Sequence, residues 1–222
     1  LAAQSDRPGG KGVALTPLTH QLVDLQVNAQ ARTAEITVKG PAKEQIPLRH
    51  SADWYPLQLA RELDATILNL RHNHLDFCLW ILKTKGSVAE ALELDAVLEK
   101  NATNWFVRET VGYLRRTFAR LDVSSRSIFA LVEPGSCFAG TLAELLYAAD
   151  RSYMLDAEEN GPSIAFSPLN FGTYPMVNGE TRISAHYCGE MPKLPVSEII
   201  DTQKAKELGL ITSAPDDIDW EG

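Results

Sequence analysis

The stretch IFALVEPGSCFAGTLAELLYAAD, residues 128–150, decides the fold of this chain. Residues 128–132 are a fully apolar run of strand length, and such a strand must be covered on both faces, as in a parallel sheet. A loop that contains Gly135 and Gly140 follows, and a short helix is expected over residues 141–149. A buried strand that leads through a glycine loop directly into a helix predicts an α/β domain.

Strands and helices are expected to alternate on both sides of this stretch. Hydrophobic periodicity predicts further strands over residues 34–39, 77–82 and 152–155 and further helices over residues 57–70, 105–121 and 202–208. This order is typical of an α/β fold. Residues 1–33 are polar and interrupted by proline and glycine, which predicts a linker or extended arm in front of the domain.

The composition excludes several classes of protein. The chain has 222 residues, of which 45% are hydrophobic and 23% charged, so a large core can form without disulfides or metals. The formal net charge of −8 argues against a nucleic-acid partner. Three cysteines without a C-x-x-C motif predict reduced thiols and a cytoplasmic protein. No apolar run approaches about 18 residues, so no membrane-spanning helix is expected.

The glycine loop is a candidate binding site. The start of a helix exposes unpaired backbone N–H groups with partial positive charge. Because Gly140 has no side chain, a ligand oxygen could approach the backbone closely, and the amides of Gly140 and Thr141 could donate to a carbonyl or a developing enolate. The alternative is a glycine that only allows tight packing between strand and helix.

Glu144 lies one turn into the same predicted helix, among leucines. A carboxyl group in an apolar cleft has a raised pKa and can act as a general acid or base. The alternative is a glutamate that stabilises the positive end of the helix dipole. No metal site is predicted, because His72 and His74 have no third ligand nearby. Cys137 is expected to pack beneath the glycine loop.

Three ordered blocks resemble the crotonase (enoyl-CoA hydratase/isomerase) superfamily. Residues 140–150, GTLAELLYAAD, resemble its signature of a glycine turn, a Glu and a later Asp. Residues 171–182, FGTYPMVNGETR, and 205–212, AKELGLIT, resemble two further segments in the same order. The resemblance covers residues 34–215 and implies a crotonase/ClpP-like spiral of ββα units. Residues 216–222 are then interpreted as the start of a truncated C-terminal extension.

Further blocks resemble the second half of ring-opening lyases that contain two crotonase-like regions; these are residues 61–65, 107–112, 121–127, 133–142 and 149–154. The resemblance implies a carbon–carbon lyase of aerobic benzoate breakdown, which opens the oxygenated ring of a benzoyl-CoA derivative with water and releases formate. CoA is part of that substrate, so no separate cofactor is expected. The implied partners are the CoA thioester, the missing crotonase-like half and further copies in a homo-oligomer.

The superfamily's site carries over only in part. One amide of its oxyanion hole maps to Gly140 and Thr141, where Thr141 replaces a glycine, and Glu144 matches one of two hydratase carboxylates. The other carboxylate falls at Pro168 and is absent, and Asp95 alone matches the segment of the second amide. Three alternatives follow: a working lyase site, a non-catalytic scaffold or dimerisation half, and a generic enoyl-CoA hydratase, which the missing carboxylate disfavours.

Overall fold

The computed structural model describes residues 18, 20–157 and 160–221. Its centre is a five-stranded sheet in the order β1-β2-β3-β4-β5, in which β1 runs antiparallel to β2 and the other neighbours are parallel. The strands are β1 (Val23–Asn28), β2 (Thr33–Lys39), β3 (Leu79–Lys85), β4 (Ser127–Val132) and β5 (Arg151–Met154). A second, antiparallel pair consists of β6 (Ser163–Ile164) and β7 (Ile200–Asp201).

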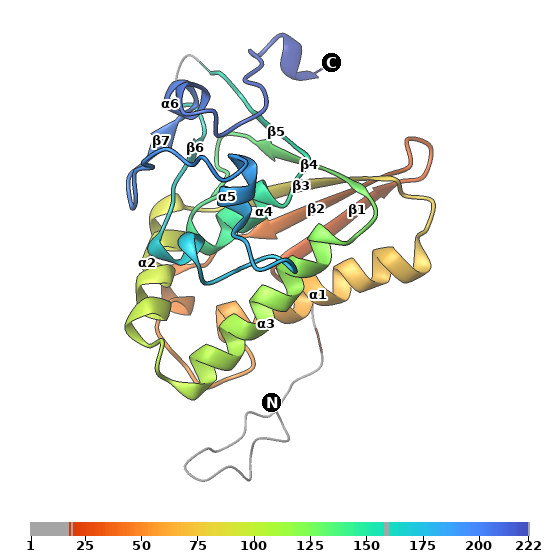
Figure 1. Ribbon diagram of the computed structural model, residues 1–222. Helices are drawn as coiled ribbons and strands as arrows, with labels where there is room; N and C mark the ends of the chain where they lie inside the picture. Colours follow the sequence, from red (N-terminus) through yellow and green to blue (C-terminus); the bar gives the residue numbers. More distant parts are fainter. Residues whose placement is uncertain (1–17, 19, 158–159, 222) are drawn as a thin grey trace.

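Helices cover one face of the large sheet, where α1 and α3 lie side by side (Figure 1). The α-helices are α1 (Tyr55–Asn73), α2 (Val88–Lys100), α3 (Trp105–Asp122), α4 (Ala143–Tyr147), α5 (Arg182–His186) and α6 (Thr202–Glu207). Short 3₁₀ turns are η2 (Lys43–Gln45), η3 (Gly140–Leu142), η4 (Pro168–Phe171) and η5 (Asp219–Glu221). Within the described part of the chain, no helix is long and apolar enough to cross a bilayer.

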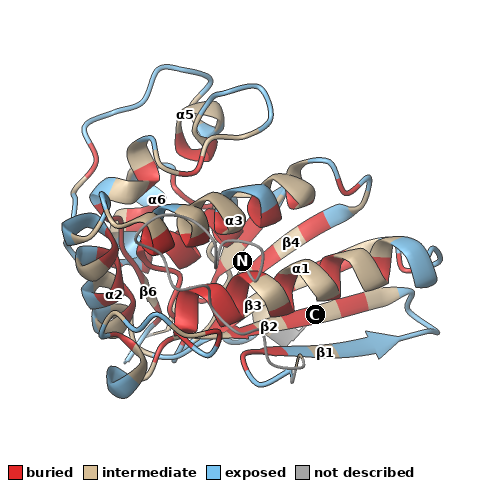
Figure 2. Cartoon of the chain, turned by 90° about the horizontal axis from the view of Figure 1, so that it is seen from below, coloured by how far each residue is buried: buried red, intermediate tan, exposed pale blue. Residues whose placement is uncertain are grey.

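The core lies between the five-stranded sheet and helices α1 and α3. Burial alternates along β2, β3 and β4, so one face of each strand is buried and the other is half-buried or exposed. Figure 2 shows buried residues of α1 and α3 on the sides that face the sheet. Each fully buried large aliphatic side chain contributes about 1.5–3 kcal/mol. The buried stripe of the long helix, α3, includes Leu114, Phe118 and Leu121, as its periodicity predicted.

The α/β prediction is confirmed, but the assignment of residues 1–33 to a linker is wrong over residues 23–28. These residues form β1, an edge strand whose side chains are mostly exposed, which is why their apolar pattern is weak. Glu62 of α1 anchors the entry to this strand, because one carboxylate oxygen accepts the backbone N–H groups of residues 21–23. Residues 1–17 and 19 of the predicted arm lie outside the described residues.

Helix α2 was not predicted. Ser87 begins it as N-cap, accepting from the backbone N–H of Glu90, and the helix buries Ala91, Leu94 and Leu98. Asp95 lies on the same buried face. The resemblance of residues 87–95 to a loop segment of the superfamily masks the helical periodicity of this stretch. The helix matters for the site, because it carries the buried carboxylate of Asp95.

Cys137 is buried and its Sγ lies against Gly40 and Gly86, whereas Cys78 and Cys188 are exposed. A Cβ atom added to Gly40 would lie 2.8 Å from Sγ of Cys137, and one added to Gly86 would lie 3.2 Å from it. Burial raises the pKa of the Cys137 thiol to about 11, so the group is an unreactive packing element. The segments that follow β2, β3 and β4 therefore meet around the sulfur atom of Cys137.

We expect Gly40→Ala to destabilise the chain by about 1–3 kcal/mol, because the new methyl group overlaps Sγ of Cys137 in a filled core. Urea unfolding at equilibrium measures the change. In the double variant with Cys137→Ala, the cost of the alanine at position 40 should largely vanish. Gly112→Ala in α3 is the control, since its methyl meets only ordinary contacts and should stabilise the helix by about 0.5–1 kcal/mol. Equal costs with and without Cys137 would contradict this packing.

Candidate functional site

The predicted site is the corner at which the loop after β4 enters η3 and α4. Gly140 has φ of +52°, a conformation that glycine adopts readily. Its backbone N–H donates to the carbonyl of Ala165 at 3.0 Å, and the N–H of Thr141 donates to Oδ2 of Asp95 at 2.7 Å. Both amides proposed as thioester donors are therefore engaged by protein acceptors, so neither is free to hold an acyl oxygen in this conformation.

The carboxylate of Asp95, on α2, fills the corner. Oδ1 accepts from the hydroxyl of Thr141 at 2.6 Å, and Oδ2 accepts from the hydroxyl of Ser167 at 2.5 Å as well as from the Thr141 amide. The phenol of Tyr174 lies 2.9 Å from the Thr141 hydroxyl. Burial raises the pKa of Asp95 to about 6, although these hydrogen bonds favour its ionised form. A Cβ atom on Gly140 would overlap Oδ2 of Asp95, so the glycine makes room for this carboxylate.

Glu144 belongs to a second buried network. Its Oε1 accepts from the side-chain amide of Asn170 at 2.7 Å, and its Oε2 accepts from Nη1 of Arg182 at 2.9 Å. Arg182 also donates from Nε and Nη2 to both oxygens of Asp122, at 2.9 and 2.7 Å. Two carboxylates thus share one guanidinium. Burial raises the pKa of Glu144 to about 7, while the nearby Arg182 and the hydrogen bonds act in the opposite direction.

The structure brings Gly140, Thr141 and Glu144 together, linked by Asn170, whose side-chain amide also donates to the carbonyl of Gly140 at 2.9 Å. The side chain of Glu144 is nearly inaccessible and both of its oxygens are bonded. Three surface pockets, of about 640, 600 and 460 Å³, are lined by other residues. The catalytic role of Glu144 stays a prediction.

Sequence reasoning missed the residues that occupy this corner. The sequence indicates Asp95 only through a match in spacing, and Arg182 only as the last residue of a resembled block. Ser167 directly precedes Pro168, the position of the missing carboxylate, and Asn170 follows that proline by two positions. Ser167 caps the 3₁₀ turn η4 by accepting from the N–H of Leu169. A polar residue before a proline at a helical N-terminus is a capping signal that could have found Ser167.

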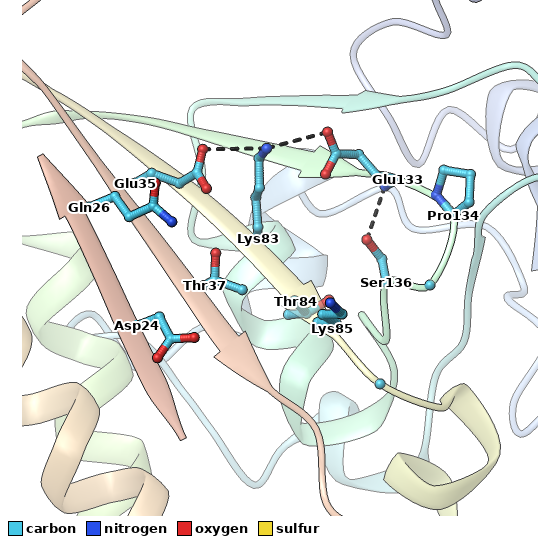
Figure 3. Close-up of a pocket in the computed structure, with 12 residues that line it drawn as sticks. Asp24, Gln26, Glu35, Thr37, Lys83, Thr84, Lys85, Glu133, Pro134 and Ser136 are labelled. Carbon is cyan, nitrogen blue, oxygen red and sulfur yellow. Dashed lines mark hydrogen bonds and ion pairs between the residues drawn. The ribbon is translucent and has the colours of Figure 1, made fainter. Parts of the chain in front are cut away.

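An open pocket of about 640 Å³ lies at the carboxyl ends of β3 and β4 (Figure 3). Lys83 points between two carboxylates, with Nζ 3.3 Å from Oε2 of Glu35 and 3.3 Å from Oε1 of Glu133. Asp24 and Lys85 also line this pocket, so carboxylates outnumber ammonium groups there. This balance disfavours a polyanionic ligand, because like charges repel it.

The outer face of the sheet is apolar beside this pocket. A second pocket, of about 460 Å³, is lined by Ile81, Phe129 and Tyr153, which alternate with the buried residues of their strands. Trp220 closes one side of it, and the indole N–H of Trp220 donates to Oε1 of Glu133 at 3.3 Å. A half-exposed apolar sheet face of this kind is suited to contact with another protein surface.

Comparison with solved structures defines the class of fold. An enoyl-CoA hydratase of Geobacillus kaustophilus is 18% identical with a TM-score of 0.60, and the match covers 91% of this chain and 71% of that one. An enoyl-CoA hydratase of Shewanella pealeana is 19% identical with a TM-score of 0.58, covering 91% and 72%. The chain therefore has the crotonase fold, as the resemblance implied.

One curated relative is much more similar in sequence. The chain is 50% identical to the benzoyl-CoA-dihydrodiol lyase of Aromatoleum evansii over 242 aligned residues, which cover 99% of this chain and 43% of the relative. This chain thus spans less than half the length of that protein. No family model matches the chain. The predicted resemblance, to crotonases in general and to this lyase in particular, is confirmed.

The two buried carboxylates predict a pH dependence of stability. Asp95 and Glu144 have pKa values of about 6 and about 7, above their ordinary values of 3.8 and 4.5. Between the ordinary and the raised pKa values, the folded chain therefore binds more protons than the unfolded chain. The stabilisation from these two carboxyl groups is complete below about pH 4 and is lost as pH rises through the pKa values of the folded chain. We expect the free energy of unfolding from these groups to fall by on the order of 3 kcal/mol between about pH 5 and pH 8.5.

Urea unfolding over this pH range measures the effect. Glu144→Gln is the matched variant, because a neutral amide of the same shape replaces a carboxyl that is easily protonated. It should remove the part of the decline that extends from about pH 4.5 to about pH 7. The remaining decline, which ends near pH 6, belongs to Asp95. An identical pH profile for the variant and the unaltered chain would contradict the assignment.

Proposed function

We propose that this chain is part of a benzoyl-CoA-dihydrodiol lyase. That enzyme would open the ring of 2,3-epoxybenzoyl-CoA, or of the corresponding dihydrodiol, with cleavage of a carbon–carbon bond, addition of water and release of formate, in the aerobic breakdown of benzoate in the cytoplasm. The observation that carries the proposal is the 50% identity that extends over 99% of the chain to a lyase of this name. CoA enters only as part of the substrate.

Within such an enzyme, this chain is proposed to be the supporting half. The Thr141 amide is held by Asp95, Glu144 is buried against Arg182, and Pro168 occupies the position of the second hydratase carboxylate. General acid–base catalysis commonly contributes a factor of about 10²–10⁴ and needs a group within hydrogen-bond reach of the substrate. The working acid and base are therefore assigned to the other crotonase-like region of the same protein.

The proposed partners follow from the same division. The other crotonase-like region carries the CoA-thioester substrate, and the assembly forms homo-oligomers as the crotonase resemblance implies. The apolar outer face around Ile81, Phe129 and Tyr153 supports a role in such contacts, because half-exposed apolar area is stabilised when a partner covers it.

The second candidate is a working lyase site in this chain, with Gly140 and Thr141 as thioester donors and Glu144 as the proton-transfer group. The near-neutral pKa of Glu144, raised by burial, favours it. It requires Asp95 to leave the corner, which breaks its hydrogen bonds to Thr141 and Ser167. The third candidate, a generic enoyl-CoA hydratase, is disfavoured because this chain has Pro168 where the second hydratase carboxylate is expected. Hydration of crotonyl-CoA by this chain would restore that candidate.

A chimera separates the two candidates. We expect the Aromatoleum evansii lyase to keep its turnover within about threefold when this chain replaces its matching segment and carries Glu144→Gln, because a supporting residue that keeps its shape does not enter the reaction. The chimera with unaltered Glu144 is the control. A loss of about 100-fold or more in kcat, with an unchanged melting temperature, would assign Glu144 to the catalytic machinery instead.

Calorimetry tests the chain alone. A supporting half without an open acyl site should bind benzoyl-CoA with a Kd no tighter than about 1 mM, which isothermal titration detects as the absence of saturation at micromolar concentrations. The Aromatoleum evansii lyase, titrated with the same ester, is the positive control. Micromolar binding by this chain would count against the supporting role and for a site of its own.

A further inference from the structure

The carboxylate of Asp95 is held in the manner of a bound ligand. Four of the residues at the corner come from separate parts of the chain: Asp95 from α2, Thr141 from η3, Ser167 from the turn before η4, and Tyr174 beyond it. All four are at least 97% buried. Across the described residues, no lysine, arginine or histidine lies within ion-pair distance of Asp95, so neutral donors alone satisfy this carboxylate.

The donors to Asp95 are held in place by neighbouring groups of the chain. The hydroxyl of Thr141 gives its hydrogen to Oδ1 of Asp95, so the phenol of Tyr174 donates to the Thr141 oxygen. The backbone N–H of Ser167 donates to Oδ1 of Asn170 at 3.0 Å, which holds the serine in place. Hydrogen bonds to an ionised acceptor are short and strong, as the distances of 2.5–2.7 Å show. Such a preorganised set of donors defines a carboxylate site.

The backbone is shaped for the same purpose. Any side chain at position 140 would overlap Oδ2 of Asp95, and Gly140 also needs its positive φ to turn the Thr141 amide toward that oxygen. The sequence predicted that Gly140 lets a ligand oxygen approach the backbone. In the structure, the oxygen that approaches it is Oδ2 of Asp95, from the same chain.

We propose that Thr141 and Ser167 form a binding site for a small carboxylate, and that the side chain of Asp95 is its resident, intramolecular ligand. The proposal deepens the proposed supporting role, because an acyl-oxygen position that the side chain of Asp95 already occupies cannot receive a thioester. The description of this corner as an acyl-oxygen position rests on that proposed role. The binding site itself depends only on the contacts above. Removal of the resident carboxylate should leave room for a free one.

Formate is the probe, because it is the smallest carboxylate. It has no carbon atom beyond its carboxylate carbon, so nothing in it would overlap helix α2. Asp95→Gly removes the whole side chain of the resident ligand. In about 0.5 M formate, we expect its melting temperature to exceed that in equal sodium chloride by at least about 3 °C, since a ligand that binds only the folded state stabilises it. Circular dichroism during heating, at constant pH near neutrality, gives the measurement.

Two controls separate site binding from a general salt effect. In the unaltered chain the carboxylate of Asp95 fills the site, and in Asp95→Asn a side chain of the same size fills it. Both should show a difference between formate and chloride of no more than about 1 °C. A formate effect of equal size in all three proteins would overturn the proposal, and so would its absence from Asp95→Gly.

Where Asp95→Gly is unfolded in chloride, refolding takes the place of melting. Recovery of the helical circular dichroism spectrum in formate but not in chloride supports the site, and an unfolded chain in both salts overturns it. No CoA ester is used, so this result is independent of whether the chain binds or converts one. Loss of turnover in the chimera would not contradict the carboxylate site. Absence of a formate effect would not contradict the proposed relationship to the lyase.

Discussion

The residues around the candidate site depend on the ion pairs that the buried guanidinium of Arg182 makes with Asp122 and Glu144. It joins the end of α3, through Asp122, to α4, through Glu144, and it donates to the carbonyl of Tyr174 at 2.9 Å. A buried charge is tolerated only when its hydrogen-bonding capacity is satisfied, and removing one partner of such a network commonly costs about 3–5 kcal/mol. Because Arg182 holds Glu144 in place, the carboxyl that resembles a catalytic group is also a structural one.

A second constraint is the side chain of Asn170, which shares the carboxylate of Glu144 with Arg182. Asn170 bonds both the carbonyl of Gly140 and the carboxyl of Glu144, so the Arg182 network and the Asp95 cluster share one corner. Buried polar groups are costly unless paired, and here each is paired with another part of the same chain. The crotonase fold is thus retained while the groups that could contact a thioester are used for packing. Such a corner suits a region that supports chemistry carried out elsewhere.

The outer face of the sheet provides the contrast. There Lys83 lies between Glu35 and Glu133 at the rim of an open pocket, and these groups keep contact with water. Exposed ion pairs of this kind contribute little to stability, with a median of about 0–1 kcal/mol. These three charged groups lie on the opposite side of the sheet from α1 and α3, next to an apolar surface.

The sequence by itself determined the α/β class, the positions of α1, α3 and the central parallel strands, and the relationship to crotonases, because apolar periodicity and short motifs are local. It also predicted that Pro168 stands where the resembled superfamily has its second carboxylate. It missed β1, whose edge position leaves most of its side chains in water, and α2. Only the tertiary structure decided the chemistry of the corner, because Thr141 lies 46 residues from Asp95 and Glu144 lies 38 residues from Arg182. Hydrogen-bond partners separated this far along the chain meet only after packing, so the glycine turn that appeared open in the sequence is closed by its own carboxylate.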